Sequence, residues 1–529
     1  MVITANYVDI FNKKIFPAKI TIKNGKIQSV EETEKAENYI LPGFIDAHIH
    51  VESSMLPPSS FGEIMLMHGH TASVSDPHEI ANVLGLKGVY WMMENAKKTP
   101  FKIYFGASPC VPATSFETSG AKLGVEEIEE LLKRDDILYL SEVMNFPGVI
   151  NGDEDMINKI NLAKKYHKQI DGHCPGLRGD DLNKYISAGI ETDHEAFSYD
   201  EAEEKIKKGM KIIIREGSAA KNYEVLHPLI AKYPDMLMFC SDDRHPDDLI
   251  KGDVNLLVKR SLKLGYELFD VLKIACINPV LHYGLDVGML RAGDNADFII
   301  VDNLENFNVL KTFINGEKVY EKGVDLRFEK IDTINNFNAE KLENIEFPGC
   351  TEYNVIEAID GELITRKLTY KGAGPNIDED ILMMCVVNRY KPAKPSVAFI
   401  KGFGLKYGAI ATSVAHDSHN IVAVGTNKKD LLKAVNMIIE MKGGICAVKD
   451  EEAVSLKLDI AGLMSSQNGF EVAEKYKEVQ NFAKNLGSRL RSPFMTLSFM
   501  ALLVIPELKL SDKGLFDGVK FEFTNLCIS

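Results

Sequence analysis

The sequence LPGFIDAHIHVESS, residues 41–54, is apolar for several residues and then places His48 and His50 one residue apart. Side chains of a β-strand alternate between its two faces, so both imidazoles point the same way, about 7 Å apart along the chain. Two imidazoles on one face, at the end of an apolar strand, are typical of half a metal site. Taken alone, the stretch also fits a polar pair where a strand leaves the core.

This stretch opens a series of eight short apolar runs that are rich in β-branched residues. Most of the segments between them have helical composition, for example IANVLGLKGVYWMMENAKK and DEDMINKINLAKKYHK. Eight strand–helix alternations in about 240 residues predict an α/β fold, a (β/α)8 barrel over residues 41–284. A doubly wound open sheet is the alternative, and the count of eight favours the barrel.

The segments on either side of the barrel have different patterns. YVDIFNKKIFPAKITIKNGKIQSVEE and LRAGDNADFIIVDNLENFNVLKTFINGEKVY both alternate apolar and polar residues around turn signals, as hairpins do. They predict one small discontinuous β-domain, residues 1–40 plus 285–325. Residues 330–529 contain further strands and helices, such as AIATSVAHDSHNIVAVGT and KKDLLKAVNMIIEMK, and predict a separate C-terminal α/β or α+β domain.

The bulk composition excludes some classes of function. The chain has 529 residues, 45% of them hydrophobic, and a formal net charge of -15, which argues against binding to a nucleic-acid backbone. The N-terminus lacks a basic region followed by an apolar core, and MTLSFMALLVIPEL is shorter than the roughly 20 residues that span a bilayer. The eight scattered cysteines suggest free thiols in a reducing compartment. We therefore expect a cytoplasmic protein with no membrane partner.

Ionisable side chains are concentrated at the ends of the eight apolar runs, and in barrels of this class the catalytic groups lie at the carboxyl ends of the strands. These residues are His48, His50, Asp76, His78, Glu142, His173, Asp193, His194, Glu195, Arg215, Glu216, Ser218, Asp242 and Asp243. Because one rim brings such groups together, we expect a metal site. Four histidines and two carboxylates among these residues could serve as its ligands.

Six ligands are too many for one tetrahedral ion that keeps an open position, so the pattern predicts two ions about 3.5–4 Å apart. Glu142 is the natural bridging carboxylate between them. Such ions lower the pKa of bound water toward about 7, so that hydroxide is available at neutral pH. Asp242 is placed to move protons to a leaving group. The prediction is a hydrolase that attacks an sp² carbon.

The same motifs resemble those of a known superfamily. PGFIDAHIH, DGHCPG, ETDHEA and CSDDRHP resemble the amidohydrolases, from Met1 to about Lys322. Six further motifs, in their order along the chain, resemble those of the bacterial and archaeal-type adenine deaminases. They are HVESSMLPPSSF, DPHEIANVLG, SEVMNFPGVI, DGHCPGL, IREGSAAKN and SDDRHP. That family also has a C-terminal domain of about this size, so the resemblance covers the whole chain.

The resemblance implies hydrolysis of adenine to hypoxanthine and ammonia, a step of purine salvage, with two Mn²⁺ or Fe²⁺ ions per site. Histidine and carboxylate ligands suit Zn²⁺ equally well. The resemblance also implies six metal ligands: His48 and His50 at the more buried ion, Glu142 as the bridge, His173 and His194 at the second ion, and Asp242 in contact with a metal. Asp242 and Glu142 would also carry protons. We expect adenine and water as small-molecule partners, and a homo-oligomer, a dimer.

Two other functions fit the pattern. Another amidohydrolase could cleave a cyclic amide or an N-acyl group, and only SEVMNFPGVI and IREGSAAKN speak for adenine against it. A metal-bound barrel that serves as a binding module without catalysis is the third hypothesis. The complete ligand set and the presence of Asp242 argue against it.

Five further residues are candidate substrate contacts, each with a structural alternative. His78 either occupies a turn before a helix that starts near Glu79, or one of Asp76, His78 and Glu79 contacts substrate or an extra metal. Glu216 and Ser218 either bind the edge of the adenine ring or begin a helix, with Ser218 as its N-cap. His416 and His419, in VAHDSHN, either belong to a polar β-turn or close over the mouth of the barrel.

Overall fold

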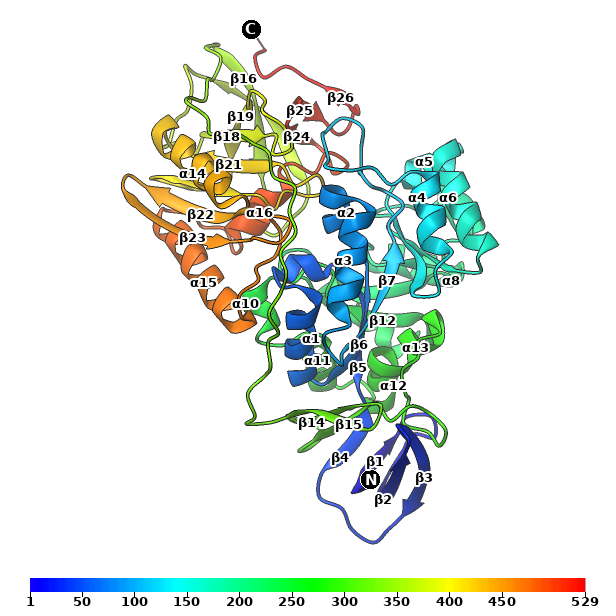
Figure 1. Cartoon of the computed structure of the whole chain (residues 1–529). Coiled ribbons are helices and arrows are strands. Elements are labelled where there is room, and N and C mark those ends of the chain that lie inside the picture. Colours follow the sequence, from blue (N-terminus) through cyan, green and yellow to red (C-terminus); the bar gives the residue numbers. More distant parts are fainter. Residues whose placement is uncertain (529) are drawn as a thin grey trace.

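Eight parallel strands form the centre of the molecule (Figure 1). The computed structural model describes residues 1–528. Each strand pairs in parallel with the next along the chain within two groups, β5 to β9 and β10 to β12. The strands are β5 (Phe44–Ile49), β6 (His70–Ser75), β7 (Lys102–Ala107), β8 (Ile137–Val143), β9 (Gln169–Gly172), β10 (Thr192–Asp193), β11 (Lys211–Arg215) and β12 (Leu237–Cys240).

Backbone hydrogen bonds close these two groups into a barrel. The N–H of Glu191 donates to the carbonyl of Ile170 at 3.0 Å, which joins β10 to β9. The N–H of Asp242 donates to the carbonyl of His48 at 3.0 Å, which joins β12 to β5. An open sheet would leave β5 and β12 on opposite edges, so the predicted (β/α)8 barrel is confirmed.

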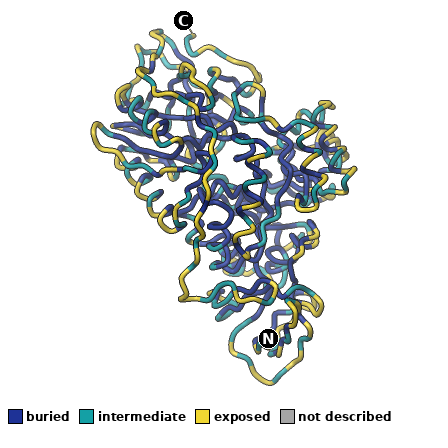
Figure 2. The backbone as a smooth tube through the Cα atoms, in the orientation of Figure 1, coloured by how far each residue is buried: buried dark blue, intermediate teal, exposed yellow. Residues whose placement is uncertain are grey.

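Helices cover the outside of the barrel, and the strands are accordingly buried on both faces, as dark segments in Figure 2 show. All six residues of β6 are buried, so the polar–apolar alternation of a half-exposed strand is missing. The helices are η1 (Val51–Ser54), α1 (Pro58–Met67), α2 (His78–Leu84), α3 (Leu86–Ala96), α4 (Val125–Leu132), α5 (Phe146–Asn151), α6 (Glu154–Lys165), α7 (Gly179–Ser187), α8 (Tyr199–Lys207), α9 (Tyr223–Leu226), η2 (His227–Ala231), η3 (Pro234–Met236), α10 (Pro246–Leu249), α11 (Val254–Lys263), α12 (Leu268–Leu272), η4 (Lys273–Ile277) and α13 (Asn278–Tyr283).

A seven-stranded sheet is formed by strands that precede the barrel in the chain and strands that follow it, in the order β15-β14-β13-β4-β1-β2-β3. Its tight turns follow from the sequence: Asn24 and Gly25 have φ of 51° and 75°, values that an Asn-Gly pair adopts readily in a hairpin. The strands are β1 (Val2–Asp9), β2 (Lys14–Lys23), β3 (Lys26–Glu32), β4 (Tyr39–Pro42), β13 (Phe298–Val301), β14 (Val309–Ile314) and β15 (Glu317–Glu321).

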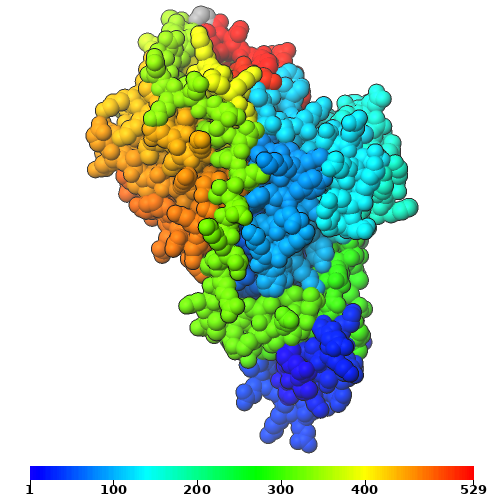
Figure 3. All heavy atoms as spheres, viewed as in Figure 1, coloured from blue at the N-terminus to red at the C-terminus, as the bar shows by residue number. Residues whose placement is uncertain are grey.

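The C-terminal region contains an eight-stranded sheet, in the order β17-β16-β19-β18-β21-β20-β22-β23, and a small sheet of β24, β25 and β26. Residues 322–351 reach it without a helix or strand, along the groove between the barrel and this region (Figure 3). The elements are β16 (Glu352–Ala358), β17 (Thr365–Lys371), β18 (Leu382–Val387), β19 (Ser396–Lys401), β20 (Ala409–Thr412), β21 (Ile421–Gly425), α14 (Lys428–Met441), β22 (Gly444–Lys449), β23 (Glu452–Lys457), α15 (Gly469–Asn485), α16 (Pro493–Phe499), β24 (Leu508–Ser511), β25 (Gly514–Asp517) and β26 (Glu522–Phe523).

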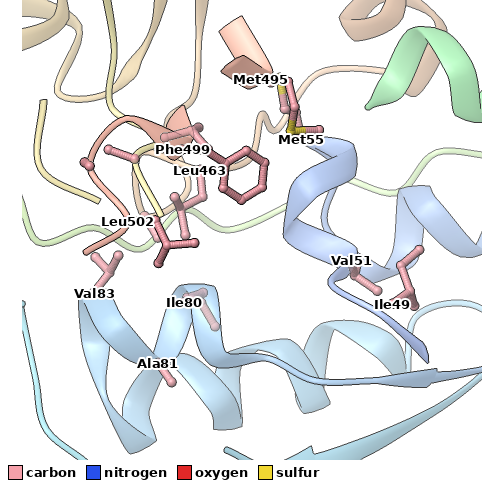
Figure 4. Packing of buried hydrophobic residues seen from close by; sticks show 14 of the residues in the cluster. Ile49, Val51, Met55, Ile80, Ala81, Val83, Leu463, Met495, Phe499 and Leu502 are labelled. Carbon is pink, nitrogen blue, oxygen red and sulfur yellow. The ribbon is translucent and has the colours of Figure 1, made fainter. Parts of the chain in front are cut away.

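An apolar cluster joins the C-terminal region to the rim of the barrel. Phe499 and Leu502 face Ile80 and Val83 of α2 in Figure 4, and all four are buried. The backbone N–H of Ser465 also donates to the carbonyl of Met55, at 2.8 Å. The C-terminal region therefore covers the end of the barrel where the strands terminate.

The expectation of free cysteines is wrong for one pair. Cys350 and Cys527 form a disulfide although 177 residues separate them, because folding brings their Cα atoms within 5.9 Å. The other six cysteines are free and buried. Among residues 1–528, no helix combines the length and the apolar composition that crossing a bilayer requires.

Candidate active site at the barrel rim

The six predicted metal ligands meet at the carboxyl ends of the strands. His48 lies in β5, His50 directly follows it, and Glu142 lies in β8. The other three follow β9, β10 and β12, so residues from five strands converge on one point. They are His173, His194 and Asp242.

Glu142 separates the histidines into two groups. Its Oε1 lies 3.2 Å from Nε2 of His50, whereas its Oε2 lies 2.6 Å from Nδ1 of His173 and 3.3 Å from Nε2 of His194. Asp242 completes the first group, with Oδ1 at 3.4 Å from Nε2 of His48 and 3.1 Å from Nε2 of His50. This is the arrangement expected when one carboxylate bridges two cations.

The buried histidines fit metal ligation better than ordinary core packing. Both ring nitrogens of His48 and both of His194 are buried without a hydrogen bond to any described residue. Leaving such a group unpaired in a core costs about 1–3 kcal/mol, so buried polar groups normally have partners. Nδ1 of His50 lies 3.0 Å from the carbonyl of Asp76, which favours the tautomer with the proton on Nδ1. The unprotonated Nε2 then faces Glu142 and Asp242. The donor set of imidazoles and carboxylates suits a divalent cation.

The local charges keep the two carboxylates ionised. Burial raises the pKa of Glu142, but the neighbouring His173, His194 and His50 outweigh it and hold the pKa well below its usual value. Burial likewise raises the pKa of Asp242, and the Arg215 guanidinium, together with His48 and His50, lowers it further than burial raises it. Ionised carboxylates are the form that binds a metal ion.

Arg215 pairs with two acids at the rim. It donates to Oδ2 of Asp242 at 2.6 Å and also to Glu195. Because the guanidinium holds Oδ2, the other oxygen of Asp242 is the one that faces His48 and His50. Arg215 thus orients the carboxylate that the sequence predicted both as a metal ligand and as a proton carrier.

A cavity lies above these residues, between the rim and the C-terminal region. His50, His78, Glu142, His173 and Asp242 line it from the barrel. The opposite wall is largely apolar and had no recognisable signal in the sequence, because none of its residues carries a reactive group. It consists of Leu363, Phe499, Leu502, Val504 and Ile505, with His416 and Asp417 beside them.

Two of the predicted substrate contacts are not brought to this cavity. The Glu216 carboxylate pairs with Lys221 at 3.2 Å and with Arg260 at 3.4 Å. The Ser218 hydroxyl donates to Asp248 at 2.8 Å, and Ser218 caps no helix of its own segment. Both residues follow β11 in an irregular segment, where the period-2 rule that places strand side chains no longer applies.

The other three predicted contacts lie at or next to the cavity. His78 and His416 line it, and both are buried. His419 is not among its lining residues and lies behind His416, in contact with Glu79. Glu79, which was a possible contact of substrate or an extra metal together with Asp76 and His78, joins the barrel to both histidines of the C-terminal loop.

A closed parallel barrel whose rim gathers four histidines and two carboxylates defines the class of metal-dependent hydrolases called amidohydrolases. Comparison with known proteins agrees: the amidohydrolase family model matches residues 39–319, and the model of the adenine deaminase C-terminal domain matches residues 361–522.

Full-length relatives make the assignment more specific. An adenine deaminase from Sulfurovum sp. (strain NBC37-1) is 59% identical, with 100% of both chains covered. Those of Borreliella burgdorferi and Methanosarcina mazei are 52% and 51% identical, with 99% and 98% of both chains covered. The chain belongs to the adenine deaminase family of the amidohydrolases.

Proposed function

We propose that this chain hydrolyses adenine to hypoxanthine and ammonia at the barrel rim, with two divalent cations held by the six rim ligands. The observation that carries the proposal is the position of Glu142 between two histidine groups, in a chain that matches adenine deaminases from end to end. Hydrolysis of another cyclic amide or of an N-acyl group has no comparable support among the full-length relatives.

In this proposal His48, His50 and Asp242 hold one cation, His173 and His194 hold the other, and Glu142 lies between them. Mn²⁺ or Fe²⁺ is the expected metal, and the ligand types also accommodate Zn²⁺. When bound, such ions supply hydroxide at neutral pH by lowering the pKa of water. The chain contributes the fixed geometry: five strand ends set the ligands, and the carbonyl of Asp76 sets the tautomer of His50.

The proton transfers fall to Asp242, with Glu142 as the second candidate. Water adds its oxygen to C6 of adenine while one of its protons reaches ring nitrogen N1 and the other reaches the amino group, which leaves as ammonia. Arg215 holds Oδ2 of Asp242, so Oδ1, which faces the rim, is the oxygen that would both contact a cation and carry a proton between water and the purine. The amino group leaves only when protonated, so this transfer is required.

The substrate would lie between the rim and the apolar wall. Phe499, Leu502 and Ile505 offer apolar contact to the flat purine, and His78 and His416 offer polar contact at its edge. We further infer a cytoplasmic enzyme that acts as a homodimer. The net charge of -15 makes a free base a more suitable partner than a polyanion.

One assay tests the substrate and the metal together. The purified protein is stripped with a chelator, reloaded with Mn²⁺, and supplied separately with adenine, adenosine and a cyclic amide while ammonia release is followed. We expect release from adenine only, and only in the reloaded protein. Release from adenosine but not adenine would overturn the substrate, and full turnover after metal removal would overturn the mechanism.

A further inference from the structure

Three buried side chains meet between the barrel and the C-terminal region, outside the six rim ligands. Glu79 lies in α2, whereas His416 and His419 lie in the loop between β20 and β21. More than 330 residues separate the acid from either histidine in the chain, and the contact between Glu79 and His419 alone spans 340 positions. Their contacts determine the protonation of each ring nitrogen and which nitrogen has no partner among the described residues.

His419 is held in one tautomer. The backbone N–H of Ala415 donates to its Nδ1 at 3.2 Å, so Nδ1 carries a lone pair and the proton of the neutral ring is on Nε2. Nε2 in turn contacts Glu79 Oε2 and donates to it. An Nε2 that carries a proton does not bind a metal ion, so the three side chains form a cluster of one carboxylate between two imidazoles rather than a third cation site.

The His419 backbone supports a dedicated role. Its φ is 53°, in the left-handed region that residues other than glycine adopt at some cost in free energy. Its own N–H donates to the carbonyl of Ala415 at 2.7 Å. Together with the bond to Nδ1, this fixes both the backbone and the ring of His419 against the same residue.

Glu79 uses its other oxygen to orient His416. Oε1 of Glu79 lies 2.6 Å from Nδ1 of His416, and the His416 ring is stacked on Phe499 with centroids 4.5 Å apart and planes at 13°. The rotation and tilt of the imidazole are therefore both fixed. Nε2 makes no hydrogen bond to a described residue, and His416 lines the cavity.

The charge on His416 also favours a donor. Burial lowers its pKa, but Glu79 outweighs burial and raises the pKa to about 9. Asp243 and Asp417 add to this effect. A ring that is protonated at neutral pH carries hydrogen on both nitrogens, so Nε2 presents an N–H to whatever occupies the cavity.

Resting on the proposed function, we propose that His416 donates its Nε2–H to a ring nitrogen of the bound purine, and that Glu79 and His419 are positioning residues that aim it. The C-terminal region thereby supplies part of the substrate site. The purine ring nitrogens are acceptors, so a donor fixed against an aromatic ring would recognise the edge of the base. Glu79, on the barrel, makes the aim of this donor depend on the docking of the two regions.

The test compares adenine with analogues in which one acceptor nitrogen is replaced by C–H: 3-deazaadenine and 7-deazaadenine as substrates, and 1-deazaadenine as a competitive inhibitor. We expect His416→Ala to lose about 10- to 100-fold in kcat/KM on adenine, the effect of one charge-assisted hydrogen bond. For one analogue, the one that lacks the nitrogen bound by His416, the unmodified enzyme should already bind or turn over the analogue about 10- to 100-fold less well than adenine. His416→Ala should lower the value for this analogue no further. Equal further losses on all three analogues would overturn the contact.

The positioning residues are tested by their dependence on His416. We expect Glu79→Gln to reproduce the loss of His416→Ala mainly in KM, and the double variant to be no worse than His416→Ala alone. His419→Gln, which keeps a donor for Glu79, should retain more activity than His419→Ala. Additive losses in the double variant would show that Glu79 acts elsewhere.

Controls separate folding and metal binding from recognition. Tyr476→Phe removes another hydrogen bond across the same boundary, to His245 Nδ1, and should leave the KM for adenine unchanged. His416→Gln serves where His416→Ala does not fold. If His416→Ala removes a third bound Mn²⁺ per chain by elemental analysis, the cluster is a metal site and the proposal fails. If the unmodified enzyme does not deaminate adenine, the proposed function fails instead.

Discussion

Glu142 presents a different oxygen to each of two histidine groups, and this single side chain would lie between the two cations of the proposed site. Its Oε1 is 3.2 Å from His50 and its Oε2 is 2.6 Å from His173. If a residue that ligates two metal ions is replaced by one that ligates a single ion, the second ion loses a ligand. The effect of its removal is therefore larger than that of one hydrogen bond.

Replacing Glu142 with glutamine should lower kcat for adenine at least about 100-fold, because the neutral amide supplies one weak ligand atom in place of two charged ones. Bound Mn²⁺ should fall below that of the unmodified protein. Ammonia release and elemental analysis measure the two effects. Glu203→Gln, on the outer helix α8, is the matched control and should change neither quantity. Full turnover by Glu142→Gln would contradict the bridging role.

Residue-scale prediction succeeded where a local pattern carries the geometry. His48 and His50 were predicted from the alternation of strand side chains to point the same way, and both face Asp242 in the structure. Glu216 and Ser218 followed a strand end by the same logic, yet their side chains pair with Arg260 and Asp248. The rule ends with the strand, and the direction of a side chain in the next turn depends on partners that the local sequence does not contain.

At the scale of elements, helix α8 anchors the strand ends that carry two of the histidines. Lys205 of α8 is fully buried and donates to Asp193 at 2.9 Å, to Glu201 at 2.6 Å and to the carbonyl of Cys174 at 2.7 Å. Asp193 and Cys174 are the neighbours of His194 and His173 in sequence. One ammonium group thus connects the loops after β9 and β10 beneath the site.

Lys205→Met should destabilise the protein by about 3–5 kcal/mol, because it leaves Asp193 and Glu201 buried without a counter-ion. Urea unfolding at pH 7 measures the loss. Lys207→Met, on the exposed side of the same helix, should cost less than about 1 kcal/mol. An equal effect of the two substitutions would show that the buried pair contributes no more than the surface pair.

The same substitution should depend on pH in a defined direction. Burial raises the pKa of Asp193, but the Lys205 ammonium outweighs burial and lowers this pKa below its usual value. The ion pair therefore stabilises the folded state fully at pH values above the pKa of Asp193 in the unfolded chain. Its contribution decreases as the pH falls toward the lower pKa of the folded state. Without Lys205 burial prevails, the pKa rises, and acid relieves the buried charge. The stability difference between Lys205→Met and the unmodified protein should therefore shrink between pH 7 and pH 4. A constant difference would contradict this assignment.

At the scale of the whole molecule, the barrel and the C-terminal region share one apolar cluster beside the site. The cluster that includes Val51, Ile80, Phe499 and Leu502 is continuous across the boundary, as Figure 4 shows. Neither region can expose this surface without a large cost in free energy, at about 25 cal/mol for each Å². The apolar wall of the cavity is thus also part of the contact that closes the fold.

A chain truncated after residue 327 should aggregate, because it exposes the barrel side of this cluster, and it should not turn over adenine. Light scattering and ammonia release measure the two outcomes. The full-length chain carrying Phe470→Ala, at a partly exposed position on α15, should remain monodisperse and active. A soluble and active truncated barrel would show that the C-terminal region is dispensable.

Metal removal should also destabilise the whole chain, because the ligands come from five strands around the barrel and binding occurs only in the folded state. At a metal concentration 100 times the dissociation constant, the expected stabilisation is about 2.7 kcal/mol per site. Thermal unfolding of the apo and Mn²⁺-loaded proteins measures it. Glu142→Gln should show a smaller metal-dependent shift than the unmodified protein.

The sequence by itself determined the eight apolar runs, the hairpin turn at Asn24–Gly25 and the shared face of His48 and His50, one residue apart. Each depends on the alternation of a strand or on the φ that one or two residues adopt. Only the tertiary structure decided three other features: the contact of Glu79 with His419, the disulfide of Cys350 with Cys527, and the apolar cavity wall that includes Leu363 and Ile505. These pairs are far apart in sequence, and no local preference specifies a partner hundreds of residues away. Packing around a common core, which minimises exposed apolar surface, brings them together.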